Sequence, residues 1–568
     1  MAWTHLTRAF VSFKPFYLPL GLLLALAPAL PARAFHPVAA RHGMVVSSEP
    51  LASEAGVQIL QAGGNAVDAA VAVGFALAVT YPYAGNIGGG GFMLIRLADG
   101  RATFIDYREE APSAASRDMY LDANGQIIPG ASTVGARAVG VPGTVAGLAL
   151  AEQKYGKLGL ARVMRPAIQL ARGFTVSYWL SQSLRNSKVI SQFDESRHIF
   201  QRDGDFYSPG DTFKQPELAR TLRLIAHNGP NGFYHGPVAR DIAATMQKYG
   251  GIVTLEDLAR YKAKARQPLH GHFRGFDILA PPPPSSGGTA LIEMLNILDP
   301  MDLGQPDSYS SIHLVAETMR RAYADRAAYL GDTDFASVPV AGLTSPEYAA
   351  KLRQEILESK PEAPVSAGKP QPFEGANTTH FSVVDDDGNA VSNTYTLNAG
   401  YGSGVTVRGA GFLLNDEMDD FTSKAGAPNM FGLIQSEANA IAPHKRPLSS
   451  MTPTIVLQND QVRLVLGSPG GGTIINTVLQ VLLNVLTYKM DVLQAVMAPR
   501  FYHQWMPDQL TLEEGRFSAE TLEKLRQAGY KVVLRSDIGE CEAIEVDPAT
   551  GWRFGAADPR GAGKAAGY

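Results

Sequence analysis

The stretch Thr378-Thr-His-Phe-Ser-Val-Val-Asp-Asp-Asp-Gly-Asn-Ala-Val-Ser-Asn-Thr-Tyr-Thr-Leu397 decides the fold prediction. Two runs rich in β-branched and aromatic residues flank a turn of Asp and Gly, which is typical of a β-hairpin. A turn centred near Asp387 places Thr396 or Leu397 opposite Thr378. The hairpin register therefore brings a second hydroxyl-bearing residue near Thr378 if Thr396 is the partner.

Thr378 has a position that suits a nucleophile. It begins the first strand of the hairpin and follows a polar, Pro- and Gly-rich segment, Glu355 to Gly375, which we expect to be an exposed linker. If the Asn377–Thr378 bond were cut, the new α-amine of Thr378 could act as general base for its own Oγ1. The alternative is that Thr378 and Thr379 are only the β-branched start of a strand.

The composition excludes several classes of protein. The chain has 568 residues, of which 45% are hydrophobic and 18% charged, with 57 Gly and 37 Pro, as in loop-rich globular proteins. Its 50 basic and 54 acidic residues give a formal charge of −4 without a long Lys/Arg run, which argues against nucleic acid as a partner. A single cysteine, Cys541, excludes a disulfide framework and a thiolate zinc site.

The first 34 residues have the pattern of a secretory signal peptide. Arg8 and Lys14 precede an apolar run from Tyr17 to Leu30, and Ala32-Arg-Ala34 follows it. We expect cleavage after Ala34 and a periplasmic or secreted protein without a stable membrane anchor. A membrane anchor is the alternative, but the run is short and interrupted by proline.

The rest of the chain predicts alternating helices and strands. Gly63-Gly64 ends one helix, and Asn65 is the N-cap of the next, with Asp68 near its positive end. The segment 281–288, Pro-Pro-Pro-Pro-Ser-Ser-Gly-Gly, predicts a rigid and then flexible connection. Helices are expected at 49–62, 66–79, 142–155, 160–173, 217–228, from 289 and at 308–330, and strands at 92–97 and 102–107.

Common catalytic and cofactor motifs are missing from the sequence. It has no G-x-S-x-G, HExxH or GxxxxGK[ST] motif. The glycine run Gly85 to Gly91 enters a strand instead of a helix, which argues against a nucleotide. His270 and His272 are the only close pair of histidines and would share one face of a strand, but we do not expect a metal site there. His380 and His444 are likewise better explained as structural. We therefore expect no cofactor and no metal, and the nucleophile must be a hydroxyl activated in another way.

Ten ordered motifs closely resemble the γ-glutamyltransferases, also called glutathione hydrolases, and they span the mature chain. In the second half these are Asn377-Thr-Thr-His-Phe-Ser-Val-Val-Asp385, Thr394-Tyr-Thr-Leu-Asn398, Gly411-Phe-Leu-Leu-Asn-Asp-Glu-Met-Asp-Asp-Phe421, Arg446-Pro-Leu-Ser-Ser-Met-Thr-Pro-Thr454 and Gly467-Ser-Pro-Gly-Gly-Gly472. In the first half they are Gly63-Gly-Asn-Ala-Val-Asp-Ala-Ala70, Gly85-Asn-Ile-Gly-Gly-Gly-Gly-Phe92, Asp106-Tyr-Arg-Glu109, Pro142-Gly-Thr144 and Pro282-Pro-Pro-Ser-Ser-Gly-Gly288.

This resemblance implies an α+β fold of the N-terminal-nucleophile hydrolase type, a four-layer αββα sandwich. It also implies a precursor that cuts itself between Asn377 and Thr378 into a large subunit, residues 35–377, and a small subunit, residues 378–568, which stay together as a heterodimer. The implied reaction transfers the γ-glutamyl group of glutathione or a related donor to Thr378, and then to water or to an amino acid or peptide.

The resemblance also implies roles for particular residues. Thr378 is the nucleophile, Thr396 hydrogen-bonds to it, and the N–H groups of Gly470 and Gly471 form the oxyanion hole. A γ-glutamyl donor carries an α-carboxylate and an α-ammonium, so its pocket needs a cation or hydroxyl donors at one end and anions at the other. The implied carboxylate partners are Arg108, Ser449 and Ser450, and the implied ammonium partners are Asn398, Glu417 and Asp420.

One residue departs from the family pattern. Bacterial relatives carry a tyrosine in a lid loop where this chain has Phe431, in Pro428-Asn-Met-Phe-Gly432. Phe431 can cover the pocket but lacks the phenol hydroxyl, which leaves the balance of hydrolysis and transfer open. Two alternatives remain: an acylase of the same fold, such as a cephalosporin acylase that cleaves a glutaryl amide, and an uncleaved exported binding or scaffold protein.

Overall fold

A computed structural model describes residues 35–358, 364–365 and 378–568. The predicted signal peptide, Asn377 and most of the predicted linker lie outside these residues. The start of that linker is not a loop, because Glu355 to Glu358 form the end of helix α15 (Pro346–Glu358). Contacts divide the chain into residues 1–36 and 37–568, and the description below concerns the second unit.

Two seven-stranded antiparallel sheets form the centre of this unit. Each sheet contains strands from before and from after Thr378, so each sheet needs both halves of the chain. The first sheet has the order β21 (Lys564–Gly567), β2 (Met44–Ser47), β12 (Thr379–Val384), β13 (Ala390–Thr396), β3 (Gly90–Arg96), β4 (Ala102–Asp106) and β9 (Lys264–Arg266). The second has the order β1 (Val38–Ala40), β20 (Arg553–Ala557), β19 (Glu542–Val546), β15 (Gln461–Gly467), β14 (Thr454–Gln458), β11 (Phe276–Ala280) and β10 (Leu269–Phe273).

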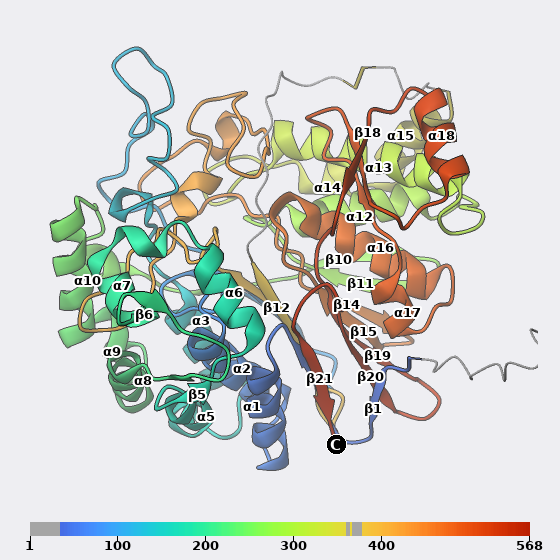
Figure 1. The fold of residues 1–568 in the computed structure, drawn as a ribbon. Helices are drawn as coiled ribbons and strands as arrows, with labels where there is room; N and C mark the ends of the chain where they lie inside the picture. Colours follow the sequence, from blue (N-terminus) through green and yellow to red (C-terminus); the bar gives the residue numbers. More distant parts are fainter. Residues whose placement is uncertain (1–34, 359–363, 366–377) are drawn as a thin grey trace, which may run out of the picture. The chain divides into compact units, whose positions relative to one another are not determined.

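Helices cover the outer face of each sheet (Figure 1). Apolar side chains fill the space between the sheets. Helices α1 (Pro50–Gln61), α2 (Ala66–Thr80) and α3 (Thr144–Tyr155) pack on the first sheet. Helices α12 (Gly287–Leu298), α16 (Ile474–Leu486) and α17 (Val492–Met497) pack on the second. This is the four-layer αββα sandwich that the sequence predicts, and the prediction is confirmed.

Further elements surround the sandwich. The helices are α4 (Leu160–Val163), α5 (Arg165–Leu170), α6 (Tyr178–Asn186), α7 (Asp194–Phe200), α8 (Pro216–Asn228), α9 (Asn231–Tyr234), α10 (Gly236–Tyr249), α11 (Leu255–Arg260), α13 (Tyr309–Tyr329), α14 (Val340–Leu343) and α18 (Ala519–Gln527). The strands are β5 (Phe174–Thr175), β6 (Gln201–Arg202), β7 (Asp205–Phe206), β8 (Thr212–Phe213), β16 (Phe501–Tyr502), β17 (Leu510–Glu513) and β18 (Val532–Arg535).

Local signals in the sequence explain the bounds of α2. The side chain of Asn65 accepts hydrogen bonds from the first turn, and Asp68 bonds back to the Asn65 N–H, which forms a capping box. Every residue of α2 is buried, as its small apolar residues predict. Across the part of the chain that the structure describes, no helix is long and apolar enough to cross a membrane.

The hairpin of β12 and β13 has the predicted register. Thr379 pairs with Tyr395, so the next pair outward is Thr378 with Thr396 and not with Leu397. The glycine run lies beside this end of β13, where a Cβ atom on Gly89 would approach the carbonyl oxygen of Thr396 to 2.1 Å. Glycine is required there because two backbones are in direct contact, which gives the run a packing role.

The segment 281–288 differs from its prediction. It is buried along its whole length instead of forming a flexible connection. Its two serines hold it in place: the Ser286 N–H donates to the Ser449 carbonyl oxygen at 2.8 Å, and Ser285 Oγ donates to the Met451 carbonyl oxygen at 2.6 Å. These two hydrogen bonds satisfy backbone acceptors that burial removes from water.

Candidate active site

Thr378 and Thr396 lie side by side at one end of the first sheet. Their Oγ1 atoms are 3.5 Å apart, the long limit of a hydrogen bond, and Thr378 is only 6% exposed. Thr396 Oγ1 also accepts a hydrogen bond from the Asn398 N–H at 2.8 Å. Asn398 has a positive φ of 78°, which turns the chain out of β13 so that this N–H points back at the hydroxyl.

One narrow pocket collects nearly all residues that the resemblance implies. It has a volume of about 20 Å³, little more than the space of a single water molecule. Of the implied residues, Gly470 is absent from its lining, and Asn377 lies outside the described chain. The implied residues that line it are Arg108, Thr378, Thr396, Asn398, Glu417, Asp420, Phe431, Ser449, Ser450 and Gly471.

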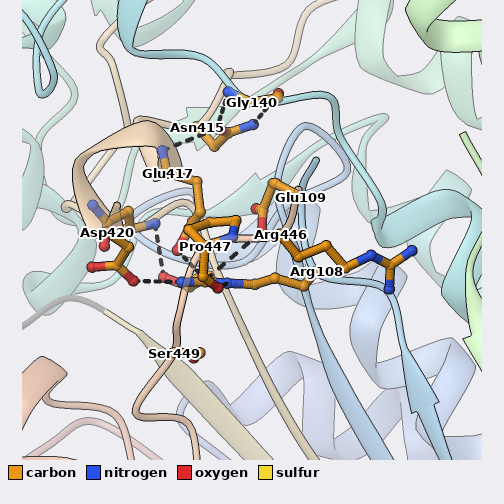
Figure 2. A network of polar contacts seen from close by, with 12 residues as sticks. Arg108, Glu109, Gly140, Asn415, Glu417, Asp420, Arg446, Pro447 and Ser449 are labelled. Carbon is orange, nitrogen blue, oxygen red and sulfur yellow. Dashed lines mark hydrogen bonds and ion pairs between the residues drawn. The ribbon is translucent and has the colours of Figure 1, made fainter. Parts of the chain in front are cut away.

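Arg108 is the centre of a buried ionic cluster in this pocket (Figure 2). It follows β4, and its guanidinium donates to Glu417 Oε1 and, at 2.5 Å, to Asp420 Oδ2. Glu109 Oε2 lies 3.8 Å from the same guanidinium. Arg108 Nε donates to the Pro447 carbonyl oxygen at 3.1 Å, which fixes the plane of the fork.

Burial raises the pKa of each carboxyl group in the cluster. The pKa of Glu109 rises to about 7, and those of Glu417 and Asp420 also rise, while Arg108 opposes these shifts. Burial lowers the pKa of Arg108, but the neighbouring carboxylates outweigh it and the net shift is upward. Three carboxyl groups face one guanidinium, so a cationic ligand group beside them would stabilise their ionised forms.

The arrangement differs from the expected separation of cation and anions. The family resemblance implies that Arg108 lies at one end of the pocket and the two acids, Glu417 and Asp420, at the other. In the structure, Arg108 is in direct contact with both acids. The physical reason is that charges removed from water need partners, and each is the nearest partner of the other.

Ser449 and Ser450 join the pocket through the buried segment described above. Ser286 Oγ donates to the Ser449 carbonyl oxygen at 2.6 Å. Arg326, on α13, donates from Nη2 to Ser450 Oγ at 3.1 Å and from Nε to Ser286 Oγ at 2.9 Å. A second guanidinium therefore lies behind the two hydroxyl groups, and the sequence gives no signal for it.

Gly470 and Gly471 adopt backbone conformations that favour glycine. Their φ angles are 135° and 53°, at the start of the short helix η5 (Gly471–Thr473). Gly471 lines the narrow pocket, whereas Gly470 lines a separate cavity that also reaches Thr378. The glycine pair and Thr378 thus stand between the narrow pocket and this separate, wide cavity.

Phe431 covers the pocket, and Asn429 holds the loop that carries it. The Phe431 ring lies so close to Gly471 that a Cβ atom there would approach it to 2.5 Å. Asn429 Oδ1 accepts the N–H groups of Phe431 and Leu433, and its Nδ2 donates to Asp420 Oδ1 at 2.9 Å. The loop and the carboxylate are therefore oriented by one side chain.

Sequence reasoning misses the residues that position the site. Asn415 lies between the backbones of Gly140 and Glu417 and hydrogen-bonds to both (Figure 2). Asn415 lies inside one of the quoted motifs, but it contacts Gly140, which is distant in sequence. Asn429 lies in the loop that carries Phe431, and its contacts are within that loop and with Asp420. Within the described residues, His, Cys, Asp and Glu side chains form no group of three suited to a metal ion.

Comparisons of the sequence with known proteins identify one family. The sequence matches the family described as gamma-glutamyltranspeptidase over residues 52–568. The glutathione hydrolase proenzyme of Escherichia coli (strain K12) is 49% identical over 533 residues, which cover 93% of this chain and 92% of that protein.

Two solved structures resemble the fold. A cephalosporin acylase from Bacillus halodurans has a TM-score of 0.82 at 29% identity, covering 98% of this chain and 99% of its own. The gamma-glutamyltranspeptidase of Helicobacter pylori has a TM-score of 0.54 at 46% identity, covering 57% of this chain and 93% of the matched chain.

Proposed function

Because the chain belongs to the gamma-glutamyltranspeptidase family, we propose that it cleaves γ-glutamyl amides such as glutathione with Thr378 as the nucleophile. Thr378 Oγ1 forms an ester with the γ-carbonyl carbon, the amine leaves, and water or an amino acid or peptide then takes the γ-glutamyl group. The observation that carries this proposal is that Thr378 shares one narrow pocket with Arg108, Asp420 and the paired serines.

The same hydroxyl performs the maturation step. Thr378 Oγ1 attacks the carbonyl carbon of Asn377, the peptide becomes an ester, and water releases residues 35–377 and 378–568. Maturation frees the α-amine of Thr378, whose ordinary pKa of about 7.7 to 8 suits a general base near neutral pH. Thr396 orients the hydroxyl in both steps.

The charges of the pocket match the two ends of the γ-glutamyl group. The donor α-carboxylate is taken by Arg108 with Ser449 and Ser450, and the α-ammonium by Asp420, Glu417 and Asn398. An ammonium beside the carboxyl groups around Arg108 would stabilise their ionised forms. The pocket volume of about 20 Å³ is far below that of a γ-glutamyl group, so the Phe431 loop must move to admit the donor.

The acylase of the same fold is the second candidate, favoured by the likeness to the cephalosporin acylase structure. A glutaryl group carries no ammonium, so it would leave the buried carboxyl groups without this partner. The charges of the pocket therefore favour a γ-glutamyl donor. An uncleaved exported binding or scaffold protein is the third candidate.

Turnover of matched anilides separates these candidates. We expect the purified mature protein to release p-nitroaniline from the γ-glutamyl anilide with a kcat/KM at least about tenfold above that for the glutaryl anilide. The reverse preference would identify an acylase. No turnover of either anilide, together with a single uncut chain, would support the scaffold alternative.

We also propose the setting in which the enzyme works. The predicted signal peptide supports export to the periplasm or the medium, and the relative from Escherichia coli is named a proenzyme, which supports a processed heterodimer. Mass spectrometry of the mature amino termini tests both points. The expected first residues are Phe35 for the large fragment and Thr378 for the small one.

A further inference from the structure

Arg326, on α13 (Figure 1), is a buried cation without an ion pair. Its side chain is 2% exposed, and no carboxylate in the described part of the chain forms an ion pair with it. Arg320 and Arg321, on the same helix, are also buried, but they pair with Glu317 at 3.4 and 2.8 Å. Burying a charge is costly unless a partner compensates it, so Arg326 needs an anion that the described residues do not supply.

Arg326 and Arg108 have opposite electrostatic surroundings. Burial lowers the pKa of both guanidinium groups, but the carboxyl groups around Arg108 outweigh it, and the net shift of the Arg108 pKa is upward. The net shift of the Arg326 pKa is downward, because Tyr323 and Asp420 offset the effect of burial only in part. An arginine remains charged near neutral pH all the same, so Arg326 brings to this region a positive charge that no carboxylate contacts.

Two serine hydroxyl groups fix the guanidinium of Arg326. Its Nε donates to Ser286 Oγ at 2.9 Å, and its Nη2 donates to Ser450 Oγ at 3.1 Å. Its Nη1 atom is buried and has no hydrogen-bond partner among the residues that the structure describes. A buried donor without a partner is costly, so this group has capacity for one more acceptor. The guanidinium is thus held in place without being saturated.

The two serines of the narrow pocket both accept hydrogen bonds from the protein. Ser450 Oγ accepts from Arg326, and Ser449 Oγ accepts from the Met451 N–H at 3.1 Å. Both serines line the narrow pocket, and neither hydroxyl donates to another residue in the described part of the chain. A hydroxyl that accepts a bond from a cation keeps its own proton available for an anion. This end of the pocket therefore favours a carboxylate over an ammonium.

We propose that Arg326 is a positioning residue for the α-carboxylate of the donor: it orients the Ser450 hydroxyl and supplies the positive charge that this carboxylate meets. This inference rests on the proposed function. The charge of Arg108 is shared with Glu417 and Asp420, which contact it directly. Arg326 has no such competitor, and a carboxylate bound at Ser450 gives the buried guanidinium the anion that it lacks.

Arg326→Gln tests the proposal with two matched donors. The γ-glutamyl anilide is compared with the anilide that carries a neutral α-carboxamide in place of the α-carboxylate. Glutamine can still donate to Ser450 but lacks the charge, so Arg326→Gln is expected to lower the carboxylate-to-carboxamide ratio of kcat/KM about tenfold. Arg326→Lys keeps the charge and is expected to restore most of this ratio. A lysine variant with the same ratio as the glutamine variant would show that the charge does not act on the donor.

Arg320→Gln is the matched control. Arg320 lies on the same helix and is equally buried, but its ion pairs are with Glu317 and Asp508. Its loss is expected to change kcat/KM for both donors by the same factor, which leaves the ratio unchanged. The proposal is overturned if Arg326→Gln has the wild-type ratio, or if Arg320→Gln lowers the ratio as much as Arg326→Gln does.

Ser286→Ala decides the question if Arg326→Gln does not mature. Ser286 lies outside the lining of the narrow pocket, and its hydroxyl accepts one of the two hydrogen bonds that fix the guanidinium. Its N–H still holds the Ser449 carbonyl oxygen in the variant. The looser guanidinium is expected to lower the ratio about threefold, and an unchanged ratio would exclude Arg326. If the wild-type protein cleaves neither donor, the proposed function itself fails.

Discussion

Thr378 Oγ1 is the atom on which both proposed reactions depend. It is nearly buried, it contacts Thr396, and it lies in the wall between the narrow pocket and the wide cavity. The neighbouring hydroxyl, Thr396 Oγ1, accepts a hydrogen bond from the Asn398 N–H. A change at this atom should therefore affect maturation and turnover together.

Thr378→Ala is expected to yield one uncut chain without turnover, because it deletes the hydroxyl used in both steps. Thr378→Ser retains the hydroxyl and is expected to mature, more slowly. A denaturing gel and an anilide assay measure the two steps. Two normal fragments from Thr378→Ala would contradict autocatalytic cleavage by this residue.

Asp420→Asn is expected to lower kcat/KM for γ-glutamyl substrates by at least about 10²-fold, because removing one partner of a buried ion pair costs about 3 to 5 kcal/mol. Glutaryl substrates should lose less or gain, since they bring no ammonium to the carboxylate. The ratio of the two activities is the measurement, because it cancels any general loss of folding or maturation.

Asp419→Asn is the matched control for this ratio. Asp419 is adjacent and buried, but it accepts hydrogen bonds from Ser132 Oγ and the Met430 N–H and does not line the narrow pocket. It should change both activities together. An equal loss for both substrates in Asp420→Asn would mean that Asp420 does not recognise the α-ammonium.

At the scale of elements, the hairpin of β12 and β13 carries the site. Thr378 immediately precedes β12, Thr396 ends β13, and the backbone of Gly89 packs against that end. The hairpin is central in its sheet, with β2 on one side and β3 on the other, so its register cannot shift without moving the site.

Thr396→Ala should slow maturation and turnover by up to about 30-fold, because it removes the acceptor of the Asn398 N–H and the contact to Thr378, each worth about 1 kcal/mol. Thr396→Ser keeps the hydroxyl and should restore most of the rate. Time courses of cleavage and single-turnover rates measure this. Wild-type rates in the alanine variant would remove Thr396 from the mechanism.

His380, on β12, should make the fold sensitive to acid. It is fully buried between Thr394 Oγ1 and Ser382 Oγ, and burial lowers its pKa to about 3. In the unfolded chain its pKa is about 6.5, so the unfolded state binds the proton first as the pH falls. This residue therefore removes about 1.4 kcal/mol of stability per pH unit between about pH 6 and pH 3.

His380→Gln tests that slope in the uncut Thr378→Ala background. Denaturant unfolding at several pH values between 6 and 4 should show a free energy of unfolding that falls less steeply with decreasing pH in the glutamine variant. Equal slopes of the free energy of unfolding against pH in the two proteins would show that protonation of His380 does not cause the loss of stability in acid. This holds even if the two proteins differ in absolute stability.

At the scale of the whole molecule, the two halves of the chain are interleaved. Each sheet contains strands from before and from after Thr378, and the C-terminal strand β21 pairs with β2 from the other half. Separating the halves would expose strand edges and the apolar layer between the sheets, so the cut should leave one assembled particle.

The mature protein should therefore give two bands of about 37 and 20 kDa on a denaturing gel, from 343 and 191 residues at about 107 Da each, and one particle in native size exclusion. Dilution without denaturant should not separate the two fragments. Elution of the fragments as independent species would contradict the interleaved fold.

The sequence alone determined the features that depend on near neighbours. The N-cap of α2 follows from side chains a few positions apart, and the structure confirms it. One short turn limits the partner of Thr378 to Thr396 or Leu397, and the structure selects Thr396. The identity of the pocket residues came from resemblance to a family, since no periodicity marks Arg108 or Asp420. The segment 281–288 and the end of α15 were predicted wrongly, because composition does not show what covers a segment.

Only the tertiary structure decided how the charged residues meet. Arg108 contacts Glu417 across 309 positions of sequence and Arg326 reaches Ser450 across 124, so neither contact leaves a local pattern. The sequence predicts which charges belong to the site, but burial forces them into direct contact, because a charge without water needs a partner. The wide cavity likewise exists only where α6 and β18 come together around Thr378.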